Sequence, residues 1–319
     1  MQVSATSDER RITGARRPHS AATILSLCLT HSAALVGLVG CASLRRHGEA
    51  TEAATACRQF SREGVAAMER GDLTRARSLL DQAVAASATD VDARRQLAEA
   101  LWQEGSREEA LVHAERAVEL DPRNAPTVAR CGEMLMALGA VDQAQRRAEQ
   151  ALELDPTLPA AWALRGRAYR YRGEHERALA DLHQALRYDP ASEETLLDIA
   201  ELQYQLGRPQ RCVTTLQNLL ESYTPGDEPR RALWLAGLAY AAVDRPTDAV
   251  DSLHAASQRG SLEPELLFQL ARAQQIAGQF TAAVATARQA AEAGHPGGQL
   301  LLAQMAADAS LEAGGTVRR

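Results

Sequence analysis

Large apolar, small and polar residues follow one another at helical spacing over residues 159–192, and a glycine divides this stretch in two. Trp162 and Tyr169 lie seven residues apart on one helix face, with the small residue Gly166 between them. Gly173 can take the positive φ that ends a helix and reverses the chain. The pattern therefore predicts a helix, a tight turn, a second helix and a stop at a proline.

The same pattern recurs along most of the chain at a spacing of 34 residues. The predicted units are 57–90, 91–124, 125–158, 159–192, 193–226, 230–263 and 264–297. One insertion, 227–229, interrupts the spacing. We number the residues within each unit as places. Small residues recur at the eighth and twentieth places, and glycine recurs at the fifteenth except in the sixth unit, where Asp244 stands and fits a positive φ less well.

The period and the order of small and large places resemble the tetratricopeptide repeat. That resemblance implies an all-α solenoid of about seven helix-turn-helix repeats, whose first helices line a concave groove. Residues 298–319 are expected to add a capping helix over Gln299–Glu312 and a disordered tail from Gly314, after a linker at Gly297-Gly298. The helix would cover the exposed face of the last repeat.

The N-terminus has the order of a secretory signal, a basic segment ending at Arg17 and then an apolar run from Ala21 to Gly40. The run ends in the four residues Leu38, Val39, Gly40 and Cys41. This ending resembles a bacterial lipobox, which implies that residues 1–40 are removed and that Cys41 carries the lipid. Ala42 then implies sorting to the outer membrane, facing the periplasm.

An uncleaved inner-membrane signal anchor is the alternative, because about 20 apolar residues can span a bilayer. Both interpretations hold the rest of the chain outside the cytoplasm and tethered to a membrane. A three-acyl anchor, with palmitate among its chains, would be firm. Residues 41–56 would then form the lipidated N-terminus and tether, unless the first helix already begins near Ala50.

Composition and charge exclude several function classes. The formal net charge is −6, and this mildly acidic balance argues against nonspecific nucleic-acid binding. Cys57, Cys131 and Cys212 fall in different repeats, so we expect free thiols rather than disulfides. The histidines are scattered, and the motifs of zinc sites, phosphate loops and serine hydrolases do not occur. We therefore expect no enzyme activity, no cofactor and no metal.

In tetratricopeptide arrays, places 2, 5, 9, 12 and 13 of the first helix face the groove. Carried over to this chain, these places predict partner-binding residues Arg95, Glu99, Trp102, Glu133, Arg167, Arg170, Tyr171, Glu201, Tyr204, Trp234, Phe268 and Arg272. Aromatic residues and arginine commonly anchor protein interfaces, although the aromatic ones can instead pack against the neighbouring repeat. The mixed charges favour a peptide or helix over a polyanion. Tetratricopeptide repeats that clamp the C-terminal carboxylate of a chaperone tail have asparagine at place 9. This chain has none there, which disfavours that kind of ligand.

The sequence thus predicts a non-enzymatic, membrane-tethered scaffold or assembly adaptor that binds a protein partner in the bacterial cell envelope. The arrangement resembles tetratricopeptide lipoproteins that assist type IV pilus secretin assembly or dock cell-wall enzymes. Two alternatives stay open. The groove aromatics could bind glycan or another cell-wall ligand as an accessory to an envelope enzyme, or the solenoid could be structural and self-associating.

Overall fold

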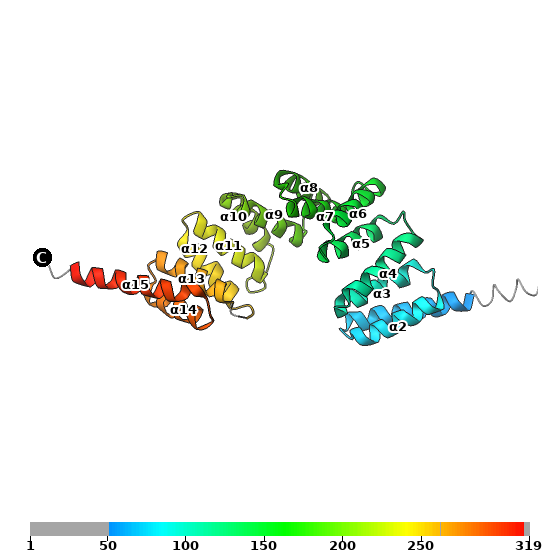
Figure 1. The fold of residues 1–319 in the computed structure, drawn as a ribbon, viewed down its shortest axis with the longest axis horizontal. Helices are drawn as coiled ribbons and strands as arrows, with labels where there is room; N and C mark the ends of the chain where they lie inside the picture. Colours follow the sequence, from blue (N-terminus) through cyan, green and yellow to red (C-terminus); the bar gives the residue numbers. More distant parts are fainter. Residues whose placement is uncertain (1–50, 262, 316–319) are drawn as a thin grey trace, which may run out of the picture.

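The computed structural model describes residues 51–261 and 263–315, which form an arch of antiparallel helix pairs without a strand (Figure 1). The expected signal and Cys41 lie outside these residues. A helix over 51–69 is followed by α2 (Leu73–Ala86), α3 (Val91–Glu104), α4 (Arg107–Leu120), α5 (Ala125–Ala137), α6 (Val141–Leu154), α7 (Pro159–Tyr171), α8 (His175–Tyr188), α9 (Glu193–Gln205), α10 (Pro209–Leu220), α11 (Arg230–Ala242), α12 (Pro246–Ser257), α13 (Pro264–Ile276), α14 (Phe280–Glu292) and α15 (Pro296–Gly315).

Each predicted unit is one helix pair, so the all-α solenoid is confirmed. The first helix of each unit is the helix over 51–69 in the first unit and an odd-numbered helix from α3 to α13 in the others. The second helix of each unit is an even-numbered helix from α2 to α14. From α5 onward, each first helix contacts the first helix of the next unit, whereas successive second helices approach each other much less. The first helices therefore lie on the inside of the curve, and we call the surface they form the concave face.

Close helix approach explains the small residues at the eighth place. A Cβ atom added to Gly237 on α11 would lie 2.4 Å from Cγ of Leu253 on α12. Non-bonded carbon atoms do not approach each other so closely in a packed protein. Ala200 and Ala271 occupy the same place in other units and are fully buried. The prediction that this place must be small is confirmed.

The turn between the two helices of a unit uses a left-handed residue, as predicted. Gly105 has φ 96° and Gly207 has φ 67°, and the turn glycines of the other units fall between these values. Asp244 adopts φ 58° in the sixth unit. An aspartate at this φ is strained relative to glycine because of its Cβ atom.

The insertion before the sixth unit is held by Arg259, and Arg230 ties the start of α11 to the segment before α13. Arg259 donates to Glu228 at 2.5 Å and to the carbonyl of Gly226 at 3.2 Å. Arg230 at the start of α11 pairs with Glu263 at 2.8 Å. The three extra residues therefore form a fixed loop between α10 and α11, and the solenoid continues beyond it.

The C-terminal helix differs from the prediction. Gly297 and Gly298 lie in the first turn of α15 rather than in a linker. A Cβ atom at Gly298 would lie 2.7 Å from the backbone nitrogen of Ala291 on α14, so this glycine lets α15 pack closely against the last repeat. The helix also continues through Gly315, the last residue described.

At the other end, the chain is already helical at residue 51, the first residue described, six residues before the expected start of the first unit at residue 57. Part of the expected tether is therefore helical. Within 51–261 and 263–315, no helix combines the length and the hydropathy needed to cross a bilayer.

Candidate partner-binding groove

Two networks of ion pairs cross the concave face, and the first joins α3 to α5. Arg130 on α5 donates from Nε and Nη2 to one oxygen of Glu99 on α3, at 3.0 and 2.8 Å. Its Nη1 donates to Glu133 at 2.9 Å. Two carboxylates predicted to bind a partner are thus already paired with a guanidinium of the chain.

The second network joins α7, α9 and α11. Arg167 donates to Asp198 at 2.5 Å, and Arg170 donates to Glu201 at 2.9 Å. Arg231 on α11 binds the other oxygen of Glu201, with Nε at 2.8 Å. Although burial favours the neutral guanidine, the charge and hydrogen bond of Asp198 raise the pKa of Arg167.

Sequence reasoning missed Arg130 and Asp198, which are central to these networks. Both stand at the sixth place, which the groove pattern does not include. The signal available was their spacing: Arg130 precedes Glu133 by three residues, and Asp198 precedes Glu201 by three. Residues three apart lie on the same helix face, so each belongs beside a predicted groove residue.

The predicted groove tryptophans are half-buried between repeats. Trp102 packs against the core clusters on both sides of α3, and the guanidinium carbons of Arg107 and Arg130 lie 5.5 and 5.8 Å from its ring centre. Trp234 packs against the core of the fifth to seventh units, and its Nε1 is buried without an acceptor in the described structure. Most of their apolar surface therefore serves packing between repeats.

Phe268 and Tyr171 have different surroundings. The ring of Phe268 stacks on His295, with centroids 4.2 Å apart. His295, in the turn between α14 and α15, also lies 2.8 Å from Glu265, so this pair fastens the turn before α15 to α13. Tyr171 has 71% of its surface exposed and lines a polar cavity at the turn edge beside Arg172, among residues at the start of α6.

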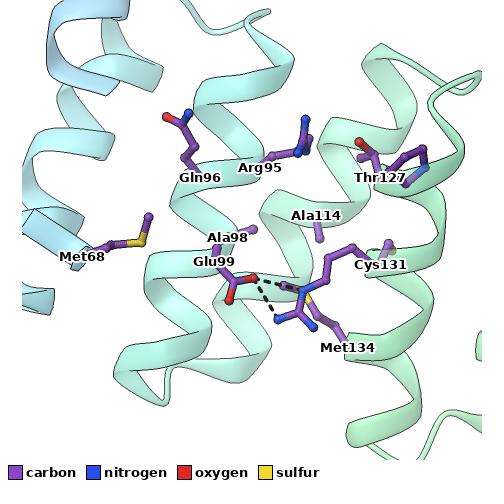
Figure 2. Close-up of a pocket in the computed structure, with 11 residues that line it drawn as sticks. Met68, Arg95, Gln96, Ala98, Glu99, Ala114, Thr127, Cys131 and Met134 are labelled. Atoms are coloured by element: carbon purple, nitrogen blue, oxygen red, sulfur yellow. Dashed lines mark hydrogen bonds and ion pairs between the residues drawn. The ribbon is translucent and has the colours of Figure 1, made fainter. Parts of the chain in front are cut away.

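A cavity of about 320 Å³ opens between α3 and α5 (Figure 2). Its apolar lining comes from Ala98, Ala114, Cys131 and Met134, with Met68 on the helix over 51–69 at one side. The backbones of α3 and α5 approach less closely than those of the later first helices, and the small alanine side chains leave the space unfilled.

Polar groups form the rim of this cavity. The pair of Glu99 and Arg130 crosses it, drawn as dashed lines in Figure 2, and Arg95 lies exposed beside it. The side-chain oxygen of Gln96 is buried without a donor in the described structure.

The cavity does not carry an activated nucleophile. Burial raises the pKa of Cys131 to about 11, so its thiol is neutral and unreactive at physiological pH. The arrangement instead suits an apolar side chain of a peptide, with its backbone hydrogen-bonded at the rim. Elsewhere in 51–261 and 263–315, no group of three or more His, Cys, Asp or Glu side chains is placed to hold a metal ion.

A smaller cavity of about 210 Å³ lies between α9, α11 and α13. Half-buried Tyr204 from α9 and Leu238 from α11 both line it. Arg272 on α13 lies exposed at its edge, with its guanidinium carbon 5.9 Å from the ring centre of Phe268. Tyr204 and Arg272, both predicted from the sequence, thus meet at one place on the concave face.

The family model described as tetratricopeptide repeat matches residues 67–112, 101–168 and 169–238. No curated protein sequence matches the chain. Among solved structures, PilF of Pseudomonas aeruginosa is similar, with TM-score 0.58, 18% identity, and 72% of this chain and 99% of that chain covered.

PilW, described as a widely conserved type IV pilus biogenesis factor, aligns with TM-score 0.59 and 16% identity, over 66% of this chain and 96% of that chain. A tetratricopeptide repeat protein from Parabacteroides merdae ATCC 43184 aligns with TM-score 0.55 and 16% identity, over 79% of this chain and 99% of that chain. At these sequence identities, the similarity shows a shared fold and no more. With the helix pairs, the turn residues and the family match in agreement, the chain belongs to the tetratricopeptide repeat family.

Proposed function

We propose that this protein is a non-enzymatic assembly adaptor that holds a segment of another protein on its concave face. The observation that carries the proposal is the cavity of about 320 Å³ between α3 and α5. It combines an apolar interior with a rim that carries Arg95, Glu99 and Arg130. An apolar side chain inserted there would be desolvated in the cavity, and the neighbouring polar groups of the peptide would lie at the rim.

The ion pairs around this cavity support a polypeptide ligand over a polyanion. Glu99 and Glu133 together outweigh the single positive charge of Arg130, so this group of side chains carries no excess positive charge. A phosphate-rich ligand would have to break these pairs, whereas a peptide can lie over them and exchange hydrogen bonds with their edges. The half-buried states of Trp102 and Trp234 also leave little aromatic surface for stacking on a sugar ring.

We further propose that the adaptor acts at a membrane of the bacterial envelope. The support is the apolar run that ends in Leu38, Val39, Gly40 and Cys41, which resembles a lipobox. The likeness in fold to PilW, a type IV pilus biogenesis factor, is consistent with a role in assembling an envelope complex. A lipid on Cys41 would keep the concave face near the membrane that carries the complex.

The experiment is site-specific photocrosslinking in the cell that naturally produces the protein. A photoreactive amino acid replaces Arg95, which is exposed at the rim of the cavity, in the full-length chain. The matched control replaces Val112, which is 63% exposed on the second helix of the same unit. We expect a discrete adduct with one other protein from position 95 and none from position 112.

Adducts of equal yield from both positions would contradict the proposal, because they would show contact without preference for the concave face. An absence of adducts from position 95 in a protein that is folded and correctly located would also contradict it. Adducts that contain only a second copy of this chain would favour the self-associating solenoid instead.

A further inference from the structure

Three sulfur-containing side chains line the cavity of about 320 Å³ between α3 and α5. Cys131 and Met134 lie on α5, and Met68 comes from the helix over 51–69 (Figure 2). Sulfur makes favourable contacts with aromatic rings, and the unbranched methionine side chain adapts to the shape of what it packs against. Because a cavity of roughly 150 Å³ already holds benzene, this larger one has room for the ring of phenylalanine, tyrosine or tryptophan.

A second cavity, of about 150 Å³, lies between α5, α7 and the start of α9. Its charged lining consists of the carboxylates of Glu133, Asp189 and Glu194 and the guanidinium of Arg167. Arg167 pairs with Glu194 at 2.9 Å and also donates to Asp198, which lies outside the lining. Three carboxylates of this cavity thus face one guanidinium, whose charge Asp198 shares.

Two of these carboxylates have room for a further partner. Among the residues that the structure describes, the exposed side chain of Asp189 has no ion-pair or hydrogen-bond partner. Glu133 accepts through Oε2 from Arg130 at 2.9 Å, and its Oε1 receives no hydrogen bond from the described residues. A cation from outside the chain can therefore bind here without displacing an internal partner.

The two cavities are neighbours on the concave face, because α5 contributes to both. Packed helices lie roughly 8–10 Å apart, and an extended chain advances roughly 3.3 Å per residue. A segment that crosses α5 therefore passes from one cavity to the other in roughly three residues.

We propose that the concave face recognises a partner segment in which an aromatic side chain and a lysine or arginine stand about three residues apart. The aromatic ring enters the cavity between α3 and α5, and the cation binds among the carboxylates of the second cavity. This inference rests on the proposed function, because it names the chemistry of the segment that the concave face holds. The charge of the second cavity favours this occupant, since an acidic segment would be repelled there.

The test selects random dodecapeptides displayed on phage, with the full-length protein in detergent as the target. We expect enriched sequences to carry Phe, Tyr or Trp and, about three positions away, Lys or Arg. In a synthetic peptide of such a sequence, replacing the aromatic residue by alanine should weaken binding roughly tenfold or more.

Charge reversal tests the second cavity. In Asp189→Lys, binding of the enriched peptides should fall roughly tenfold or more, and a new selection on this variant should no longer enrich Lys or Arg. The matched control is Asp121→Lys, because Asp121 is the C-cap of α4 as Asp189 is of α8, and it lines neither cavity. This control should bind the peptides as the wild-type protein does. Circular dichroism checks that both variants stay folded.

A bulky substitution tests the first cavity. Gln96→Trp narrows it and should weaken binding of the same peptides, whereas Gln82→Trp at an exposed position of α2 should not. Equal losses in the two tryptophan variants, or in Asp189→Lys and Asp121→Lys, would overturn the inference.

Enriched peptides that lack either the aromatic or the basic residue would also overturn it. If such peptides still lost affinity in Gln96→Trp alone, the proposed function would stand without this inference. Failure to enrich any peptide would overturn the inference, and together with no adduct from position 95 it would reject the proposed function as well.

Discussion

Arg167 of α7 donates its Nε–H to Oδ2 of Asp198 on α9, and the two atoms are 2.5 Å apart. The Asp198 side chain is only 9% exposed, and its other oxygen lies 3.4 Å from Nη1 of Arg170. One carboxylate of the fifth unit thus holds two guanidinium groups of the fourth. The pairing fastens successive repeats to each other on the concave face.

We therefore expect Asp198→Asn to lower the free energy of unfolding by about 2–3 kcal/mol, because two largely buried cations lose their shared counter-charge. The measurement is urea denaturation followed by circular dichroism. The control is Glu194→Gln, which removes a 71% exposed partner of Arg167 and should cost less than about 1 kcal/mol. Equal costs for the two variants would show that burial of the pair does not matter.

Two glycines at the eighth place differ in how closely the neighbouring helix approaches them, so replacing each by alanine should cost a different amount of stability. Gly237→Ala should cost about 1–3 kcal/mol, since the new Cβ atom would lie 2.4 Å from Cγ of Leu253. Gly166→Ala should cost less, because its nearest neighbour, Cγ of Leu182, is 3.0 Å away. Urea denaturation of the two variants measures the difference. A larger cost at Gly166 would contradict the close approach of α11 to α12.

A substitution in the turn of the sixth unit should make the protein more stable. Asp244→Gly replaces a residue held at φ 58° by one that adopts this conformation freely, so we expect stability to rise by about 0.5–1 kcal/mol. The reciprocal Gly207→Asp, at φ 67° in the fifth unit, should lower stability by a similar amount. Thermal unfolding of both variants measures the effect. Destabilisation by Asp244→Gly would indicate that the aspartate side chain contributes more than its backbone strain costs.

Alkaline pH should weaken the fold through Cys212. Burial, followed by the nearby charge of Glu201, raises the pKa of this thiol from its ordinary 9.0 to about 12. Because the folded pKa is the higher one, the stabilisation is complete below about pH 9 and is lost as the pH rises towards 12. At about pH 10.5, Cys212 should therefore have lost about 2 kcal/mol of its contribution.

The comparison is with Cys212→Ala, because alanine occupies this place in neighbouring units, as at Ala178 and Ala249. Unfolding free energies of both proteins are measured at about pH 8 and about pH 10.5, so that other titrating groups cancel. The wild-type protein should lose more stability than the variant between these values. Parallel losses would contradict a raised thiol pKa.

The proposed anchor has a direct chemical test. Mass spectrometry of the protein extracted from membranes should find an N-terminus that begins at Cys41 and carries acyl chains. In Cys41→Ser the mature lipidated N-terminus should be lost, and the protein should no longer partition into detergent. An intact N-terminus with an unmodified Cys41 thiol would reject the lipid anchor and favour the signal anchor.

Local features of the fold were accessible from the sequence. The turn position of Asp244 and the close contact at Gly237 both follow from the 34-residue spacing, because turns and helix pairs are built from neighbouring residues. Gly297 and Gly298 were misjudged, since glycine usually marks a linker. In the folded chain their lack of side chains lets α15 lie against Phe268 and Ala291.

By itself, the sequence determined the helix pairs, their order and the residues that must be small, because these depend on contacts within one repeat. The tertiary structure decided how the groove charges combine. Arg130 and Asp198 find their partners in adjacent repeats, about 28–31 residues away, and the superhelix alone places those side chains together. The same geometry separates α3 from α5 to leave a cavity.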